Sequence, residues 1–125
     1  MTWSVSYLGP EHDVVAVSYS DELDRAQLEA AFAAGLLEVN AHDTWHVLTD
    51  LRGLTGQPSV FDLYATITAV VELGVQDRYR EAVMTPTDAR LLPDVSFWET
   101  ACVNRGVDAR AFADRADALA WLALP

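Results

Sequence analysis

The segment VLTDLRGLTGQPSVF (residues 47–61) decides the fold of this chain. It begins as an apolar run, passes Asp50 and Arg52, and continues through two glycines and a proline into a segment with helical periodicity. Its first part belongs to WHVLTDL (45–51), whose β-branched and aromatic residues predict a buried central strand. Ser59 then has the position of a helix cap, with an acidic residue three places later. The segment therefore predicts a strand, a tight turn and a helix.

The sequence on either side continues this alternation of strands and helices. An antiparallel hairpin is expected at the N-terminus, because apolar and polar residues alternate over 3–8, DVVAVSY (13–19) reads as a second strand, and only the short loop at Gly9-Pro10 separates the two. We expect strands at 3–8, 13–19, 45–51, 81–86 and 107–112, and helices at 21–39, 59–74, 94–106 and 114–122. This order is β-β-α-β-α-β-α-β-α. Right-handed crossovers then predict an α/β fold with a mixed, mostly parallel sheet and helices packed on it.

Composition limits the function classes that remain. The chain has 125 residues, long enough for one hydrophobic core, and we expect a single domain over 1–125. It carries 19 acidic residues against 8 basic ones, giving a formal charge of −11, and contains no lysine. Nucleic acids and anionic lipid surfaces both attract basic proteins. The charge therefore argues against nucleic-acid binding and against binding to a membrane surface.

Cysteine content and hydropathy predict a cytoplasmic location. Cys102 is the single cysteine, so an intramolecular disulfide is excluded, and we expect it to be buried in the core. The first residues lack the pattern of a secretory signal, and no apolar run approaches the length of a membrane helix. We expect no cofactor and no metal, since His42 and His46 do not share a helical face and GLTG (53–56) is not a phosphate-binding loop.

The candidate binding residues follow the predicted central strand. In open α/β sheets, ligands bind beyond the carboxyl ends of the strands, where helix N-termini present free amides. The residues expected there are Asp50, Arg52, Gly53, Thr55, Gly56 and Ser59. They predict a site for a small anionic ligand or a partner protein, with Arg52 as its cation. The alternative is that the glycines only form a turn and Ser59 is only a helix cap.

Three parts of the sequence resemble the STAS-like fold of the anti-sigma-factor antagonists, and in particular its SpoIIAA-like branch. They are the N-terminal hairpin, LTDLRGLTG (48–56), and RAFADRADALAWL (110–122). The resemblance covers nearly the whole chain and implies a non-enzymatic regulatory or interaction module. Because this branch is often grouped with SEC14-type lipid-binding domains, it also implies an alternative, a carrier of lipids or other hydrophobic small molecules.

The phosphorylation site of the antagonists is not present in its usual form. The resemblance places an Asp-Ser-x-Gly motif where this chain has Asp50-Leu51-Arg52-Gly53, so no serine follows the aspartate. Thr55 and Ser59 are the displaced candidates for phosphorylation. A third alternative is a small enzyme with Asp50 as its base, although no paired carboxylate or nucleophile set accompanies it.

Two phenylalanines are expected to point away from the core. Phe61 and Phe97 each lie off the apolar stripe of their predicted helices, because neighbouring helical residues differ by about 100° in direction. Such side chains predict a partner surface, most simply that of a homodimer. The alternative is two isolated exposed rings.

Overall fold

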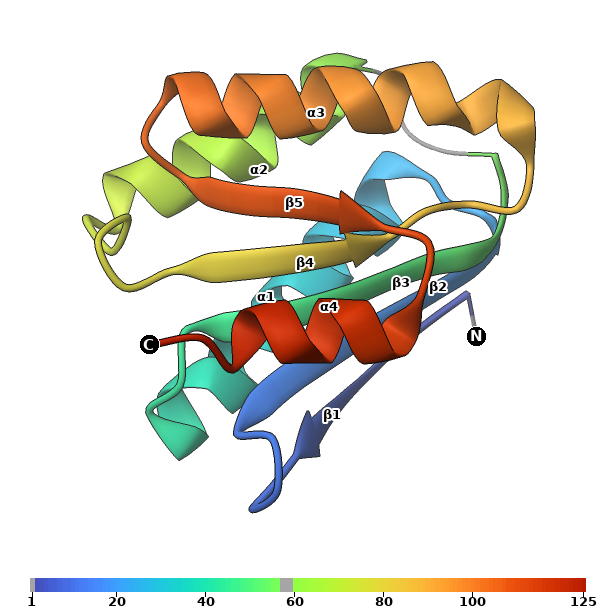
Figure 1. The fold of residues 1–125 in the computed structure, drawn as a ribbon. Coiled ribbons are helices and arrows are strands. Elements are labelled where there is room, and N and C mark those ends of the chain that lie inside the picture. The colour runs from blue at the N-terminus through green and yellow to red at the C-terminus, as the bar shows by residue number, and fades with distance from the viewer. Residues whose placement is uncertain (1, 57–59) are drawn as a thin grey trace.

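The computed structural model describes residues 2–56 and 60–125, and the side chains of Val60 and Phe61 are not included. It contains a five-stranded sheet, four α-helices and one 3₁₀ turn (Figure 1). The strands are β1 (Trp3–Leu8), β2 (Val14–Glu22), β3 (His46–Gly56), β4 (Arg80–Met84) and β5 (Asp108–Phe112). The helices are α1 (Arg25–His42), α2 (Val60–Glu72), α3 (Leu92–Asn104) and α4 (Arg115–Leu122), and the 3₁₀ turn η1 spans Ala89–Leu91.

The strands lie in their order along the chain, β1-β2-β3-β4-β5. β1 and β2 pair antiparallel, whereas the β2–β3, β3–β4 and β4–β5 pairs are all parallel. Each parallel pair is joined by a helix, as a crossover connection requires. The predicted α/β class, element order and mixed sheet are confirmed.

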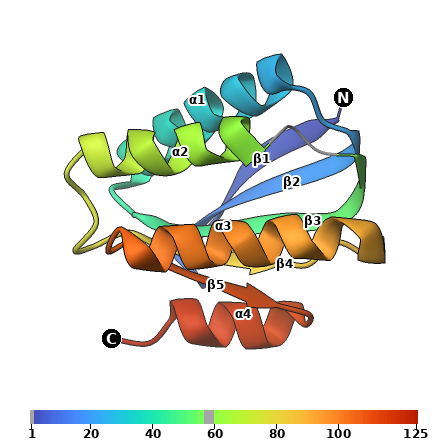
Figure 2. The same cartoon turned by 90° about the horizontal axis from the view of Figure 1, so that it is seen from above.

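The helices form layers on both faces of the sheet (Figure 2). α4 covers one face, where Ala118 and Leu122 are buried together with Leu48, Ala82 and Met84 of the strands. α1, α2 and α3 cover the other face. Because successive strand residues point to opposite faces, the residues between those buried under α4, such as Val47 and Val83, point toward these three helices.

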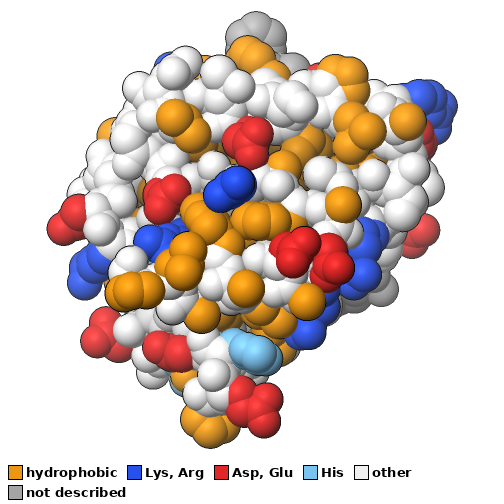
Figure 3. Space-filling model, in the orientation of Figure 1, with side chains coloured by type: hydrophobic (Ala, Val, Ile, Leu, Met, Phe, Trp, Pro, Cys, Tyr) orange, Lys and Arg blue, Asp and Glu red, His pale blue; other side chains and the backbone are white. Residues whose placement is uncertain are grey.

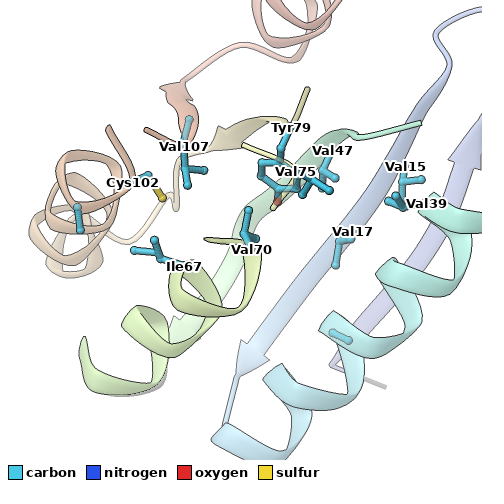
Figure 4. Packing of buried hydrophobic residues seen from close by; sticks show 13 residues of the cluster. Val15, Val17, Val39, Val47, Ile67, Val70, Val75, Tyr79, Cys102 and Val107 are labelled. Carbon is cyan, nitrogen blue, oxygen red and sulfur yellow. The ribbon is translucent and has the colours of Figure 1, made fainter. Parts of the chain in front are cut away.

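The second face of the sheet carries the larger hydrophobic core, and α2 contributes side chains to this core. Val70 on α2 points toward Val47 and Tyr79 (Figure 4). The backbone of α2 lies close to that of α3, but it has few close approaches to the backbone of the strands or of α1. The space beneath and between α1 and α2 is therefore framed by side chains.

Two predicted boundaries in the first half are wrong for related reasons. β2 continues to Glu22, so helix α1 starts later than the expected residue 21. Its cap is Asp24, whose side chain accepts a hydrogen bond from the backbone N–H of Gln27 and whose own backbone N–H donates to the Gln27 side chain. This reciprocal capping box satisfies two donors at the start of the helix.

The predicted tight turn after residue 51 is also wrong, because β3 continues to Gly56. The extension is stabilised by β2, whose Ser20 and Glu22 pair with Gly53 and Gly56. The proposed cap of α2 at Ser59 lies outside the described residues. In the second half the predictions agree better, since Asp114 caps α4 through the backbone N–H of Ala116.

Candidate functional site

The sequence-predicted cation does not face open solvent as a free group. Arg52 makes a two-pronged ion pair with Asp50, with its Nε 3.0 Å from Oδ1 and its Nη2 2.9 Å from Oδ2. The backbone N–H of Arg52 also donates to Asp50 Oδ1. Partial burial acts to raise the pKa of Asp50, but the hydrogen bonds from Arg52 outweigh it and hold this pKa below its ordinary value. Arg52, the candidate for anion binding, and Asp50, the candidate base, are therefore paired with each other.

Close packing against the neighbouring strand explains the two glycines of the predicted site, Gly53 and Gly56. A Cβ on Gly53 would lie 3.2 Å from the Cβ of Ser20, and one on Gly56 would lie 3.1 Å from the Cγ of Glu22. Both contacts come from the neighbouring strand β2. Gly56 also uses its carbonyl, which accepts a hydrogen bond from the N–H of Leu23. Close strand packing thus explains glycine at both positions.

The other predicted site residues are spread along the same end of the sheet. Thr55 is exposed on the extended part of β3, and Ser59 lies outside the described residues. The hydroxyl of Thr87, which follows β4, donates to the carbonyl of Arg52 over 3.0 Å. The structure therefore brings Asp50, Arg52 and Thr87 together. Ligand binding by the predicted set, and phosphorylation of Thr55 or Ser59, stay predictions.

A different feature stands out at the centre of the molecule. Between the sheet and helices α1, α2 and α3 lies a cavity of about 130 Å³. Protein interiors usually contain few voids larger than a water molecule, so a space of this size in a chain of 125 residues is unusual. An engineered apolar cavity of about 150 Å³ binds benzene. This cavity can therefore hold a small organic molecule.

The walls of the cavity are mostly apolar. Leu28, Gly35 and Val39 of α1 lie on one side, and Ile67 and Val70 of α2 lie on another. The cavity reaches toward the surface beside Leu73, a lining residue that is 46% exposed. The sheet forms the floor of the cavity. Aliphatic side chains of β2 and β3 line this floor, and a small group of polar side chains lies beside them.

This polar group is centred on Glu81, which lies on the interior strand β4 and lines the cavity. Its Oε2 accepts a hydrogen bond of 2.8 Å from the hydroxyl of Thr49, and its Oε1 accepts one from the hydroxyl of Tyr79. Among the described residues around the cavity, Glu81 is the only carboxyl or basic side chain. A carboxyl group is thus held in a defined position on the floor of an apolar space.

Burial changes the acid–base behaviour of this cluster. Burial raises the pKa of Glu81, although the hydrogen bonds from Tyr79 and Thr49 act in the opposite direction. Burial and the nearby Glu81 carboxylate also raise the pKa of Tyr79 and of Tyr19 above their ordinary values. The hydroxyl groups of both tyrosines are therefore neutral at physiological pH. Perturbed carboxyl groups in clefts are typical of functional sites.

Glu81 has no cationic partner within residues 2–56 and 60–125. The chain contains no lysine, and its arginines contact side chains other than Glu81. Four of them form ion pairs with Asp50, Glu29, Asp88 and Asp108. Others lie over aromatic rings, as Arg105 does over Tyr64 at 4.1 Å and Arg78 over Trp45 at 5.2 Å. Among the described residues, this partly buried carboxyl group therefore has no internal counter-ion.

The sequence predicts no site at Glu81, although this residue carries a signal once the sheet is known. Glu81 and Val83 share one face of β4, which is interior in the observed sheet, so a carboxyl group falls where the pattern requires an apolar side chain. The predicted strand 81–86 begins at this residue. The observed strand begins at Arg80 and pairs Glu81 with Val47 and Ala109.

Cys102 on α3 lines the cavity, and the reactivity of its thiol tests whether the cavity wall is closed to solvent. The side chain is 1% exposed, as predicted, and burial together with the charges of Glu81 and Glu99 raises the pKa of its thiol. Thiols react as thiolates, so we expect the native protein to react with DTNB at pH 8 at least 100-fold more slowly than the urea-unfolded chain. Rapid stoichiometric labelling of the native protein would contradict this enclosure.

The described part of the chain has neither a cluster of metal-ligand side chains nor a helix suited to cross a membrane. In residues 2–56 and 60–125, no three histidine, cysteine, aspartate or glutamate side chains are grouped as a metal site would require. Over the same residues, no helix has both the length and the apolar character needed to cross a bilayer.

Comparison with solved structures identifies the fold. A protein of the DUF3478 family from Shewanella loihica PV-4, described as uncharacterized and as having a SpoIIAA-like fold, superposes with a TM-score of 0.62. The match covers 96% of this chain and 93% of the other at 19% sequence identity. Neither the family models nor the curated proteins gave a match. At this identity the likeness concerns the fold, and it confirms that this chain adopts a SpoIIAA-like, STAS-like fold.

Proposed function

We propose that this protein is a non-enzymatic binding module that holds a small, mainly apolar molecule between its sheet and helices α1, α2 and α3. The observation that carries the proposal is the cavity of about 130 Å³ with its apolar walls. Ligand sites in proteins are typically concave and largely apolar, with a few placed polar groups, and the Glu81 cluster has that character. The role is that of a carrier or a ligand-responsive regulator.

The size and surroundings of the cavity limit the ligand. The volume suits a molecule with one ring or a short chain, whereas typical drug-sized sites span roughly 300–1,000 Å³. The small number of close approaches between the backbones of α2 and the strands supports entry of the ligand by displacement of this helix. A longer acyl chain would need the same displacement to persist.

The proposal is tested by two measurements on the full chain. Native mass spectrometry of freshly purified protein reports any co-purifying small molecule, and calorimetric titration with toluene reports binding to the empty cavity. We expect saturable binding of one toluene per chain. Absence of binding up to the solubility limit of toluene, together with a mass equal to that of the bare chain, would contradict the proposal.

A substitution in the Asp50–Arg52 pair tests whether the ligand binds in the cavity or at the site predicted from the sequence. Arg52→Ala removes an exposed side chain that belongs to neither the cavity walls nor the core. We therefore expect its toluene affinity to stay within about twofold of wild type. A loss of tenfold or more would show that the end of β3 takes part in binding, as the sequence predicted.

The partner surface predicted from the sequence concerns a separate face. Phe97 on α3 is 46% exposed, and Val103 on the same helix is 59% exposed. The opposite face, which carries α4, shows hydrophobic side chains near its centre with acidic and basic side chains around them (Figure 3). A homodimer through Phe97 stays a prediction, and sedimentation of wild type and Phe97→Asp tests it through a shift from dimer to monomer.

A further inference from the structure

The hydrogen bonds of Glu81 leave part of its capacity unused. Among the described residues, each carboxylate oxygen accepts one hydrogen bond, from Tyr79 on Oε1 and from Thr49 on Oε2. An ionised carboxylate can accept about four. Because Glu81 lines the cavity, a molecule inside it is in a position to donate to this carboxylate.

The charge of Glu81 is also uncompensated. No lysine exists in the chain, and no arginine lies within ion-pair distance of this carboxyl group among the described residues. Buried charges in proteins are generally paired, because an isolated ion loses its hydration without compensation. The missing positive charge is therefore a property that a ligand can supply.

The rest of the cavity also favours a cation over an anion. Tyr19, Tyr79 and Trp98 contribute aromatic side chains to its lining, and the faces of aromatic rings attract positive charge. The net charge of −11 raises the local concentration of cations around the protein and repels anions. A fatty acid or another carboxylate ligand would place its charge against Glu81.

We infer that the ligand is a small apolar amine, bound as its ammonium form, whose N–H groups donate to the Glu81 carboxylate while its apolar part fills the space between α1 and α2. This inference rests on the proposed function and names the ligand class for the same cavity. An ammonium group supplies both the missing charge and up to three donors, and charge-assisted hydrogen bonds are about twice as strong as neutral ones. An alcohol of the same shape supplies one donor and no charge.

Four probes with a shared ring test the inference: benzylamine, benzyl alcohol, toluene and benzoate. Each is titrated calorimetrically at pH 7.5 into wild type, Glu81→Gln and the control Glu72→Gln, which changes an exposed carboxyl group on α2. We expect wild type and the control to bind benzylamine at least tenfold more tightly than toluene or benzyl alcohol, and benzoate most weakly. Glu81→Gln should lose at least tenfold in benzylamine affinity while its toluene affinity changes by less than about threefold.

A second measurement on wild type covers the case in which Glu81→Gln does not fold. The amine stays protonated between pH 8 and pH 5, so its affinity should fall toward pH 5 as Glu81 takes up a proton, whereas toluene affinity should not. The other titratable side chains that line the cavity are Tyr19, Tyr79 and Cys102, and all three have raised pKa values, so they stay neutral over this range.

The outcomes separate the two proposals. If toluene binds but benzylamine binds no better than toluene or benzyl alcohol, the amine inference is overturned and the cavity proposal stands. An equal affinity of Glu81→Gln and wild type for benzylamine also overturns it. If none of the four probes binds wild type, the proposed function itself fails and the inference fails with it.

Discussion

Replacing Gly35 by leucine is expected to stabilise the fold and abolish binding of toluene. Gly35 lies within α1, is buried, and lines the cavity. Glycine inside a helix costs about 0.5–1 kcal/mol relative to alanine, and burying aliphatic carbons in the empty space adds about 1 kcal/mol or more. A gain of about 1–2 kcal/mol in the free energy of unfolding is therefore expected, measured by urea denaturation.

Two further variants control the Gly35→Leu experiment. Ala33→Leu adds a similar side chain on the exposed side of the same helix, and it should leave toluene affinity unchanged. Gly35→Ala tests for overpacking, because the new Cβ would lie at an ordinary 3.7 Å from the Cγ2 of Val17. If Gly35→Leu folds and binds toluene as wild type does, the cavity is not where the ligand binds.

Replacing Glu81 by glutamine is expected to remove a pH dependence of stability. Burial raises the pKa of Glu81 above its ordinary value of 4.5, so between that value and the raised native pKa the native state holds a proton that the unfolded chain has released. The resulting stabilisation is fully present below the unfolded pKa and is lost as pH rises through the native pKa. Each unit of pKa difference corresponds to about 1.4 kcal/mol.

The measurement is the difference in unfolding free energy between Glu81→Gln and wild type from pH 5 to pH 8. We expect the difference to shift in favour of the variant as pH rises, because glutamine cannot ionise and its amide can still bond Tyr79 and Thr49. Glu72→Gln should show no such trend, since its side chain is exposed. The lowered pKa values of Asp50 and Asp88 affect stability toward acid pH, but they are common to both proteins and cancel. A flat difference over this range would contradict the account of Glu81.

Local sequence signals predicted most of the fold. The N-terminal hairpin, the crossover helices and the last helix each follow from neighbouring residues, and the structure agrees with them. The failures concern long-range pairing. Gly53 and Gly56 look like turn residues in the sequence, but β2 continues far enough to pair with them, and this neighbour is invisible in a local pattern.

The candidate site was much harder to predict than the fold. The sequence pattern favours Arg52 as a binding residue because it follows a predicted strand, whereas the structure pairs Arg52 with Asp50. The cavity depends on how far α2 stands from the strands, and no motif encodes that separation. Glu81 was the one local signal, a carboxyl group in an otherwise apolar strand, and it becomes informative only when β4 is known to be interior.

Intermolecular NOEs show whether a small apolar molecule binds between the sheet and helices α1, α2 and α3. Protein with labelled methyl groups is saturated with toluene, and NOEs are recorded between the toluene protons and the protein. We expect NOEs to Val17 and Val70, which line the cavity from β2 and α2. NOEs confined to exposed side chains such as Leu37 and Val103 would contradict binding in the cavity.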